Sequence, residues 1–289
     1  MSVNKLKFLF FLSDKWFNIL LFYYNNIKLK HPLYILNFKN PTTFHEKILW
    51  LKMYYRVPNH TVYSDKIKVR QYLNNLFEID YSVPLIKVYD KVEEINFNDL
   101  PNEYILKCNH GSSMNIIVRN NGTINQNQIK NQLNNWLKTD YGLIGREYQY
   151  KNIERKILIE KLINHDENDT LIDYKLFMFN GKLKLIQLIL KENGVEKKNF
   201  YDENWNLLDL QTTNTPVSTN VKTSIHFDKM LTIAEKVAEN FYHIRVDFYA
   251  IRDEFYFSEL TFHDSGGFNG FNKLSWDLKL GEKLKIPIF

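Results

Sequence analysis

Two Asn-Gly pairs and the polar tripeptide Arg252-Asp253-Glu254 constrain the fold of this sequence most. Each of them is predicted to end one β-strand and to lead into the next element. The stretches concerned are residues 103–124, 173–191 and 242–262. The first holds a strand, a polar loop and a second strand before Asn121-Gly122, and the second turns at Asn180-Gly181. Asn-Gly between apolar runs is a strong signal for a β-hairpin. The pattern therefore predicts antiparallel hairpins and not a series of βαβ units.

Helical patterns alternate with these strands. Residues 1–60 are predicted to be helical and aromatic, and Thr42 or Thr43 can cap a helix in which Glu46 completes a capping box. A second helix is predicted to begin with Ser64 or Asp65 as its cap. Further helices are predicted at 125–138 and 228–241, and strands at 83–90 and 155–163. The fold class predicted from this mixture is α+β.

The composition is that of a globular chain. Its 289 residues are 44% apolar and 15% aromatic, which suffices for a large core and two or three small subdomains. The net charge is +5, but the basic residues are dispersed, so we predict a solvated surface and no nucleic-acid partner. The single cysteine, Cys108, excludes an intrachain disulfide and predicts a small buried residue in a reducing, cytoplasmic compartment.

The apolar N-terminus is interrupted by polar residues. Ser13, Asp14, Lys15 and Asn18 divide the stretch, so it lacks the run of about 20 apolar residues that a membrane span requires. The apolar run at 8–12 is short for a signal peptide, and no small-residue cleavage site follows it. We expect an amphipathic helix that either docks on the protein body or touches the inner face of a membrane.

Several common catalytic motifs are absent from the sequence. It contains no P-loop, no G-x-G-x-x-G, no G-x-S-x-G and no H-E-x-x-H. The chemistry must therefore be sought in less compact patterns.

The strand pair at 242–262 carries one carboxylate on each strand. In the first strand Arg245, Asp247 and Tyr249 share a face, and in the second strand Phe257 and Glu259 are predicted to share one with Thr261 and His263. A hairpin can place Asp247 opposite Glu259, where the two charges repel unless a cation lies near them. Without metal, we expect this repulsion to raise the pKa of the pair, and we expect replacement of either carboxylate by an amide to leave stability unchanged or to raise it. Mg²⁺ takes one or two carboxylates plus phosphate oxygens, so a magnesium–nucleotide site is one interpretation. The alternatives are that both carboxylates face solvent, or that Arg245 pairs with one of them.

Three other segments favour the nucleotide interpretation. Lys107 ends a strand and runs into the polar loop Asn109-His110-Gly111-Ser112-Ser113, of a kind that can close over phosphates. Lys66 lies at a helix start, and the strand edge in "LIEKLI" (158–163) offers a backbone that could hold a purine. Each segment alone is a weak signal, and their order along the chain is more specific.

In the order of these segments along the chain, the sequence resembles the TupA-like ATP-grasp family of bacterial surface-polysaccharide loci. The matching phrases are "NPTTFHEKILWLK", "YSDKIKVR", "YILKCNHGSS", "DYKLFMFNGK", "RVDFY" and "FSELTFHDSGGF". They run from about residue 40 to the C-terminus. The resemblance implies an ATP-grasp fold with two α+β subdomains clasping ATP and an N-terminal helical region. It divides the chain into 1–60 (helical), 61–100 (N-terminal α/β part), 101–165 (lid subdomain) and 166–289 (C-terminal subdomain with the metal site).

The resemblance also implies roles for single residues. Lys66 and Lys107 would hold the phosphates, the loop of His110, Gly111, Ser112 and Ser113 would cover them, and the backbone of Glu160, Lys161 and Leu162 would bind adenine. Asp247 and Glu259 would hold Mg²⁺. Two departures stand out: Thr261 replaces the usual Asn two residues after the second metal carboxylate, and the covering loop has one glycine.

Asp173 and Lys175 share a strand face and could reach ribose or phosphate. Arg245 and His263 have two interpretations each. Arg245 could stabilise the transferring phosphoryl group or pair with Asp247. His263, which precedes the glycine-containing "DSGG", could orient the acyl phosphate or be a plain loop histidine.

The function implied is an ATP- and Mg²⁺-dependent carboxylate–amine ligase acting through an acyl phosphate. Its partners would be a small-molecule or glycan carboxylate, such as a uronic acid, and an amine such as an amino acid. A sugar kinase using the same ATP site is the first alternative. A non-catalytic scaffold of a polysaccharide complex is the second.

Overall fold

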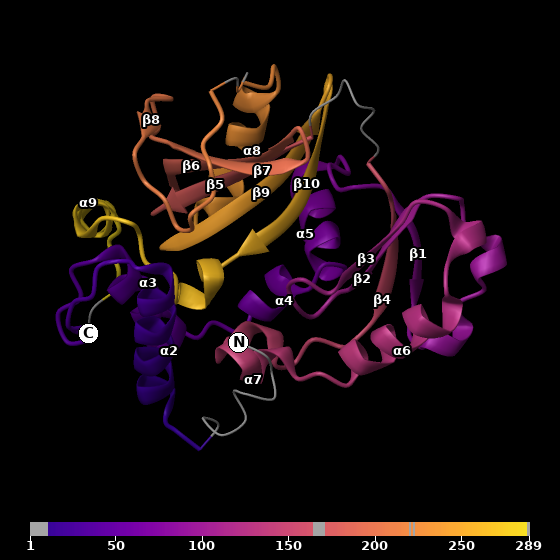
Figure 1. Cartoon of the computed structure of the whole chain (residues 1–289), viewed down its shortest axis with the longest axis horizontal. Coiled ribbons are helices and arrows are strands. Elements are labelled where there is room, and N and C mark those ends of the chain that lie inside the picture. Colours follow the sequence, from indigo (N-terminus) through magenta and orange to yellow (C-terminus); the bar gives the residue numbers. More distant parts are fainter. Residues whose placement is uncertain (1–10, 164–170, 220, 222, 288–289) are drawn as a thin grey trace. The chain divides into compact units, whose positions relative to one another are not determined.

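A computed structural model describes residues 11–163, 171–219, 221 and 223–287 of the chain (Figure 1). The chain forms two compact units: the first is Met1–Arg56 with His165–Phe289, and the second is Val57–Asn164. Each unit holds one antiparallel sheet with helices, so the predicted α+β class is confirmed. The finer division into four segments stays a prediction.

The second unit is built on a four-stranded sheet in the order β1-β4-β2-β3. Its strands are β1 (Leu85–Tyr89), β2 (Tyr104–Cys108), β3 (Asn115–Val118) and β4 (Ile157–Lys161). Its helices are α4 (His60–Ser64), α5 (Lys68–Phe77), α6 (Gln126–Leu137) and α7 (Tyr141–Gly145), with 3₁₀ turns η2 (Val92–Glu94), η3 (Phe97–Asp99), η4 (Asn121–Thr123) and η5 (Tyr148–Tyr150). Alternate residues of β2, among them the fully buried Cys108, pack with Ile129 and Leu133 of α6. Lys107 therefore lies on the other face of the sheet.

The Asn121-Gly122 pair does not turn a hairpin, so that prediction is wrong. The two residues form η4, in which the Asn120 side chain accepts a hydrogen bond from the backbone N–H of Gly122 (3.0 Å). Helix α6 follows directly, with Asn125 capping it through the N–H of Gln128. A side-chain-capped turn competes with the hairpin wherever the next element is a helix.

The first unit is built on a six-stranded sheet in the order β10-β9-β5-β6-β7-β8. Its strands are β5 (Ile172–Phe179), β6 (Lys182–Glu192), β7 (Val195–Tyr201), β8 (Leu207–Leu208), β9 (His243–Ile251) and β10 (Glu254–Thr261). Its helices are α2 (Asp14–Leu29), α3 (Phe44–Tyr54), α8 (Phe227–Ala238) and α9 (Leu274–Lys283), with the 3₁₀ turn η6 (Asp264–Gly267). Hairpins join β5 to β6 at Asn180-Gly181 and β9 to β10 after Ile251, as predicted.

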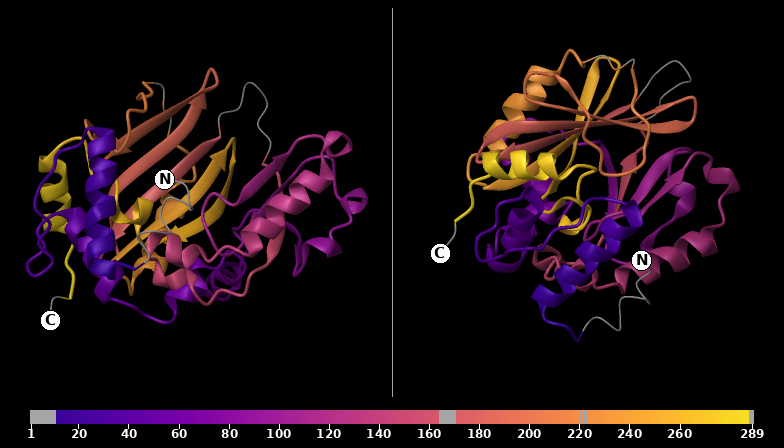
Figure 2. Two further views of the ribbon diagram at one scale, coloured as in Figure 1. Left: turned by 60° about the horizontal axis from the view of Figure 1, so that its bottom comes forward. Right: turned by 60° about the vertical axis from the view of Figure 1, so that its left-hand side comes forward.

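Helices cover the two faces of this sheet differently. Helix α8 packs against β5, β6 and β9 on one face (Figure 1). On the other face, Phe177 and Phe179 join a core cluster with Phe44 and Ile48 of α3 and Leu280 of α9. Helices α3 and α9 lie side by side there (Figure 2). Lys175 and Asp247 share the α3 side of the sheet by strand alternation, beyond this apolar cluster.

The start of α3 is fixed from two sides. Thr43 and Glu46 form the predicted capping box. The backbone N–H and the ring Nδ1 of His45 lie 3.0 and 2.9 Å from Asp277 Oδ1 in α9. The hydroxyl of Tyr34 donates to the other oxygen of Asp277. This buried network ties α3 to α9 and so holds the apolar cluster in place.

The predicted start of α5 needs a small correction. The helix begins at Lys68, and the Asp65 side chain accepts a hydrogen bond from the N–H of Ile67 at 2.9 Å just before it. Ser64 ends α4 and has no capping role. Within the described residues, no helix is long and apolar enough to cross a membrane.

His243 is a buried histidine among aromatic rings. It is 4% exposed, and the rings of Phe44 and Phe179 lie 5.5 Å from its own. Burial, opposed by a hydrogen-bonding contact between Nδ1 and the Phe262 carbonyl, lowers the pKa of His243 from 6.5 to about 3. The ring is therefore neutral in the folded protein at pH values where the unfolded chain binds a proton.

We expect this histidine to make stability depend on pH. Between pH 6.5 and 3 the unfolded state binds a proton on this histidine that the folded state does not bind. The contribution of neutral His243 to the free energy of unfolding is therefore fully present above pH 6.5 and is lost as pH falls. The free energy of unfolding should drop by about 2 kcal/mol from pH 6.5 to 5 through this group. Urea unfolding at both pH values measures the drop. His243→Leu should show a smaller one, and an unchanged drop in that variant would contradict the prediction.

Candidate functional site

In the first unit, β5, β9 and β10 bring charged side chains together. Asp247 lies opposite Lys175 of β5 and opposite Glu259 of β10 in the strand register. The predicted facing of the two carboxylates is therefore confirmed. The register shifts between Phe257 and Glu259, so these residues lie on opposite faces, and the prediction that they share one is wrong.

Asp247 is fully buried and held by two cations. Arg245 donates from Nε to Oδ1 and from Nη2 to Oδ2, both at 2.7 Å. Lys175 Nζ donates to Oδ2, also at 2.7 Å. Burial opposes ionisation, but Arg245 and Lys175 outweigh it and hold the pKa of Asp247 below its ordinary value. The expectation that repulsion from Glu259 raises the pKa of this carboxyl is therefore wrong.

The cation near both carboxylates is Arg245. Its Nη2 lies 2.7 Å from Asp247 Oδ2 and 3.7 Å from Glu259 Oε1. It also donates to Thr261 Oγ1 at 3.1 Å and forms an ion pair with Asp264. The alternative in which Arg245 pairs with a carboxylate is thus observed. The alternative in which both carboxylates face solvent is wrong, because only the Glu259 side chain is partly exposed, at 29%.

Asp173 extends the cluster along β5. Lys175 Nζ lies 2.9 Å from Asp173 Oδ2 and so bridges Asp173 and Asp247. The other oxygen of Asp173 is buried and accepts no hydrogen bond among the described residues. Burial and the Asp247 charge raise the pKa of Asp173, although Lys175 opposes the shift. The predicted pair Asp173 and Lys175 therefore belongs to the same cluster as Asp247.

The donor set of this cluster fits Mg²⁺. Asp173, Asp247, Glu259 and Asp264 supply four carboxylates against the two cations Arg245 and Lys175, which leaves a formal charge of −2. All are hard oxygen donors, and one oxygen of Asp173 is unsatisfied. Among the described residues, no three His, Cys, Asp or Glu side chains converge as a metal site. Mg²⁺ needs only one or two carboxylates when phosphates complete its shell, so the donor chemistry and this finding agree.

His263 leads into a fixed turn and not a flexible one. The side chain is 7% exposed, and η6 begins at the next residue. A Cβ on Gly267, which has φ +76°, would lie 2.9 Å from Leu49 of α3. Lys52 of α3 donates to the Gly266 carbonyl at 2.7 Å. These contacts hold the turn that carries Asp264, a residue that sequence reasoning did not single out.

In the second unit, Lys107 is paired with a buried glutamate. Lys107 Nζ lies 2.6 Å from Glu160 Oε2, and Arg70 of α5 contacts the other oxygen. Burial opposes ionisation, but Lys107 and Arg70 hold the pKa of Glu160 below its ordinary value. Only the Glu160 backbone was predicted to act, and Arg70 was not predicted at all. Ninety residues separate Arg70 from Glu160, so no local pattern indicates their contact.

The backbone of the Glu160–Leu162 segment already takes part in hydrogen bonds of the sheet. The N–H of Lys161 donates to the Pro84 carbonyl at 2.9 Å, while the Lys161 side chain is exposed. The Leu162 side chain is 7% exposed. A role of this backbone in adenine binding stays a prediction.

The loop after β2 is anchored at its start and exposed at its end. Asn109 donates from Nδ2 to Asp65 Oδ1 at 2.9 Å, and Lys66 Nζ donates to the Gly111 carbonyl at 2.8 Å. A Cβ on Gly111 would lie 2.8 Å from the Tyr141 ring, so glycine allows a close approach here. Ser112 and Ser113 are exposed. Lys66 and the loop are therefore brought together, as the sequence order suggested.

His110 points away from the loop surface. Its ring is 1% exposed, and Nε2 lies 3.1 Å from the Trp136 carbonyl at the end of α6. Burial lowers the pKa of His110, although the contact with Trp136 opposes the shift. This arrangement is typical of a packing residue, and the predicted phosphate contact of His110 has no support in the geometry.

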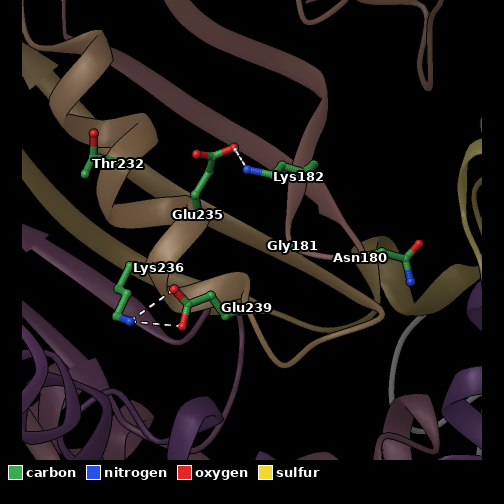
Figure 3. A pocket seen from close by; sticks show the side chains of 7 residues that line it. All are labelled: Asn180, Gly181, Lys182, Thr232, Glu235, Lys236 and Glu239. Carbon is green, nitrogen blue, oxygen red and sulfur yellow. Dashed lines mark hydrogen bonds and ion pairs between the residues drawn. The ribbon is translucent and has the colours of Figure 1, made fainter.

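One surface pocket lies apart from both clusters. It has a volume of about 420 Å³ and lies between the β5–β6 turn and α8 (Figure 3). Its charged side chains pair with each other, Lys182 with Glu235 and Lys236 with Glu239. None of the predicted site residues lines it. The candidate functional residues are therefore those of the two side-chain clusters, each within its own unit, and not those of this pocket.

Comparison with known families shows to which family the chain belongs. A family model described as TupA-like ATPgrasp matches residues 46–285. The chain belongs to the TupA-like ATP-grasp family, so the resemblance seen in the sequence is confirmed. Its α+β fold is the ATP-grasp fold. Every residue discussed in the two clusters lies within the matched range.

Solved structures give distant matches. D-alanine-D-alanine ligase from Helicobacter pylori is 17% identical with a TM-score of 0.43, covering 83% of this chain and 69% of that one. The Bacillus anthracis D-alanine-D-alanine ligase complexed with ATP is 14% identical with a TM-score of 0.39, covering 69% and 53%. The N5-carboxyaminoimidazole synthetase from Staphylococcus aureus complexed with ADP is 12% identical with a TM-score of 0.40, covering 78% and 52%. The chain thus spans about half the length of the last two. No curated protein matched the sequence.

Proposed function

We propose that the chain is an ATP-dependent carboxylate–amine ligase. The observation that carries this proposal is the match to the TupA-like ATP-grasp family over both the Lys107 cluster and the Asp247 cluster. The proposed carboxylate is of the uronic-acid type and the proposed amine is an amino acid or similar compound. The product would serve a bacterial surface polysaccharide such as a capsule, O-antigen or teichuronopeptide.

The proposed reaction has two steps. A carboxylate oxygen of the substrate attacks the γ-phosphorus of ATP, the bond from that phosphorus to the β–γ bridging oxygen breaks, and ADP leaves. The amine nitrogen then attacks the carbonyl carbon of the acyl phosphate. The carbon–oxygen bond to phosphate breaks, the nitrogen loses a proton, and the products are an amide and inorganic phosphate.

In the second unit, Lys66 and Lys107 are proposed to contact the ATP phosphates. Both ammonium groups already lie against anionic or carbonyl oxygens: Lys107 against Glu160, and Lys66 against Gly111. Glu160 would hold Lys107 extended until phosphate oxygens share the charge. The exposed Ser112 and Ser113 can donate hydroxyl hydrogen bonds to phosphate.

In the first unit, Asp247 and Glu259 are proposed to hold Mg²⁺, with Asp173 as a further donor. The ion would supply charge neutralisation on the phosphates. Arg245 is proposed to stabilise the negative charge of the transferring phosphoryl group. Its orientation is fixed by Asp247, Thr261 and Asp264, so it loses little freedom when it acts. His263 is proposed to orient the acyl phosphate or the amine.

A hydroxylamine-trapping assay tests the reaction class. The full chain is incubated with Mg-ATP, glucuronic or galacturonic acid, and hydroxylamine in place of the amine. A ligase releases ADP and forms a hydroxamate, because hydroxylamine attacks the acyl phosphate. A kinase releases ADP and leaves a phosphorylated sugar that hydroxylamine does not alter. If Mg-ATP neither raises the unfolding temperature nor yields ADP, the scaffold alternative holds and the proposal fails.

Lys107→Ala is expected to weaken ATP binding about 10- to 150-fold. The loss corresponds to one charge-assisted hydrogen bond to phosphate, about 1.5–3 kcal/mol. Isothermal titration calorimetry with Mg-ATP measures it. Arg70 still pairs with Glu160 in the variant, so the fold should persist, which thermal unfolding checks. Lys87→Ala, on the exposed edge of the same sheet, is the matched control and should bind normally. Equal affinity of the two variants would refute the phosphate role of Lys107.

A further inference from the structure

Helix α2 turns an apolar face outward. Trp16, Leu20, Tyr24 and Ile27 are 58, 45, 47 and 62% exposed. Their spacing of four, four and three residues places them on one side of the helix, here named the outer stripe. A surface helix normally exposes polar residues on this side, so the outer stripe is the reverse of the usual pattern.

The opposite side of α2 is firmly docked. Phe17 and Phe22 are fully buried, and the Phe17 ring lies 6.4 Å from that of Phe268 in an edge-on contact. Asn26 donates to the Phe268 carbonyl at 3.0 Å and accepts from the N–H of Gly270 at 2.9 Å. These hydrogen bonds fix the rotation of the helix. The outer stripe therefore faces away from the first unit as a built feature of the fold.

Apolar exposure continues at both ends of the helix. Phe11, just before it, is 81% exposed. Leu33 and Ile35, at 51 and 88%, lie in the following segment, which contacts α2 through a hydrogen bond from Tyr23 to the Tyr34 carbonyl. The outer stripe is thus part of a larger exposed apolar surface.

The exposed charges on and next to α2 are basic. Lys15, Lys28 and Lys30 are exposed on or next to the helix. The one acidic residue of α2, Asp14, forms an ion pair with Arg56. An occupant of the outer stripe must therefore complement positive charge around an apolar centre.

We propose that the outer stripe docks the protein on an anionic lipid surface, with α2 lying in the plane of the interface. Trp and Tyr favour the boundary between lipid headgroups and acyl chains, and neighbouring lysines attract anionic headgroups. A second copy of the chain is a poorer occupant, because a two-fold contact through this stripe would bring two basic rims together. This inference rests on α2 and the residues that flank it and does not depend on the ligase proposal.

Vesicle co-sedimentation of the full chain tests the docking surface. Vesicles of equimolar phosphatidylglycerol and phosphatidylcholine should bind the protein, while phosphatidylcholine alone should bind it weakly. Trp16→Gln/Leu20→Gln/Ile27→Gln should lower binding by more than about tenfold, since three apolar side chains no longer enter the lipid. The matched control Val195→Gln/Leu207→Gln/Ile225→Gln changes three comparably exposed residues of the same unit and should bind normally.

Two further measurements test the proposal even if the triple variant does not fold. Lys15→Gln/Lys28→Gln should weaken binding to the anionic vesicles and reduce its sensitivity to salt. Lipids brominated near the headgroup should quench tryptophan fluorescence in the wild type but less in Trp16→Phe.

Three outcomes would overturn the proposal. The first is that the wild type does not bind the anionic vesicles. The second is that the triple variant, shown to be folded by thermal unfolding, binds as well as its control. The third is that light scattering without lipid shows a dimer that the triple variant abolishes, which would assign the outer stripe to a second copy of the chain.

Discussion

Asp247→Asn should destabilise the first unit by about 3–5 kcal/mol, the usual effect of removing one partner from a buried ion pair. The carboxylate is fully buried and accepts three hydrogen bonds of 2.7 Å from Arg245 and Lys175. An amide of the same shape removes a carboxylate that both buried cations share, and leaves Asp173 to Lys175, and Asp264 and the more distant Glu259 to Arg245. Urea unfolding without nucleotide should show a lower midpoint than the wild type.

This expectation reverses the one drawn from the sequence alone. There, Asp247 and Glu259 repel, so replacing either should leave stability unchanged or raise it. In the structure the Arg245 guanidinium lies near both, and the interaction at Asp247 is attractive. A variant as stable as the wild type would mean that Arg245 and Lys175 do not depend on Asp247 for their charge balance.

The ion pairs of Asp247 with Arg245 and Lys175 predict how acid changes the stability of the first unit. The pKa of Asp247 is lowered in the folded state, so its contribution is present at neutral pH and disappears only as pH falls through the ordinary aspartate range and below. Loss of stability near pH 6 therefore belongs to the buried histidines, among them His243 and His110, and not to Asp247. The two effects can be separated in one pH series.

Much of the fold was predictable because its signals are local. The Thr43–Glu46 capping box and the Asn180-Gly181 turn each depend on residues within four positions, and both are present as expected. Asn121-Gly122 was misassigned because the same dipeptide also suits a 3₁₀ turn before a helix. The bulge between Phe257 and Glu259 contains neither Gly nor Pro, so strict alternation placed Phe257 on the wrong face.

The meeting of Asp247 and Glu259 was predictable from the sequence, but the pairing of the charged side chains around them was not. The spacing of Asp247 and Glu259 on a hairpin indicated that they meet. Whether metal or arginine lies between them depends on the rotamer of Arg245, which also requires Asp264 and Thr261. The pairing of Glu160 with Lys107 and Arg70 could not be predicted for another reason. Arg70 and Glu160 are brought together only by tertiary packing.

Glu259→Gln should abolish most ATP turnover without loss of stability. Of the two facing carboxylates, Glu259 is the partly exposed one. Its contact with Arg245 is 3.7 Å long, so the amide leaves Arg245 its closer partner Asp247. It removes one hard, charged oxygen donor from the proposed Mg²⁺ site. A loss of about 10²–10³-fold in kcat is expected when one interaction with the developing phosphoryl charge is removed.

Mg-dependent ADP release with the uronic acids above measures turnover, and urea unfolding measures stability in the same preparation. Glu254→Gln, on the exposed start of the same strand, is the matched control and should retain both. The contrast between Glu259→Gln and Asp247→Asn is the sharper result, because the structure gives the two facing carboxylates different roles. Asp247 is bound by cations that need it for folding in addition to its proposed metal role, whereas the partly exposed Glu259 is proposed to act in metal binding alone. A Glu259→Gln enzyme with near-normal kcat would show that the metal lies elsewhere, and one that unfolds like Asp247→Asn would show that the two carboxylates act as a single structural unit.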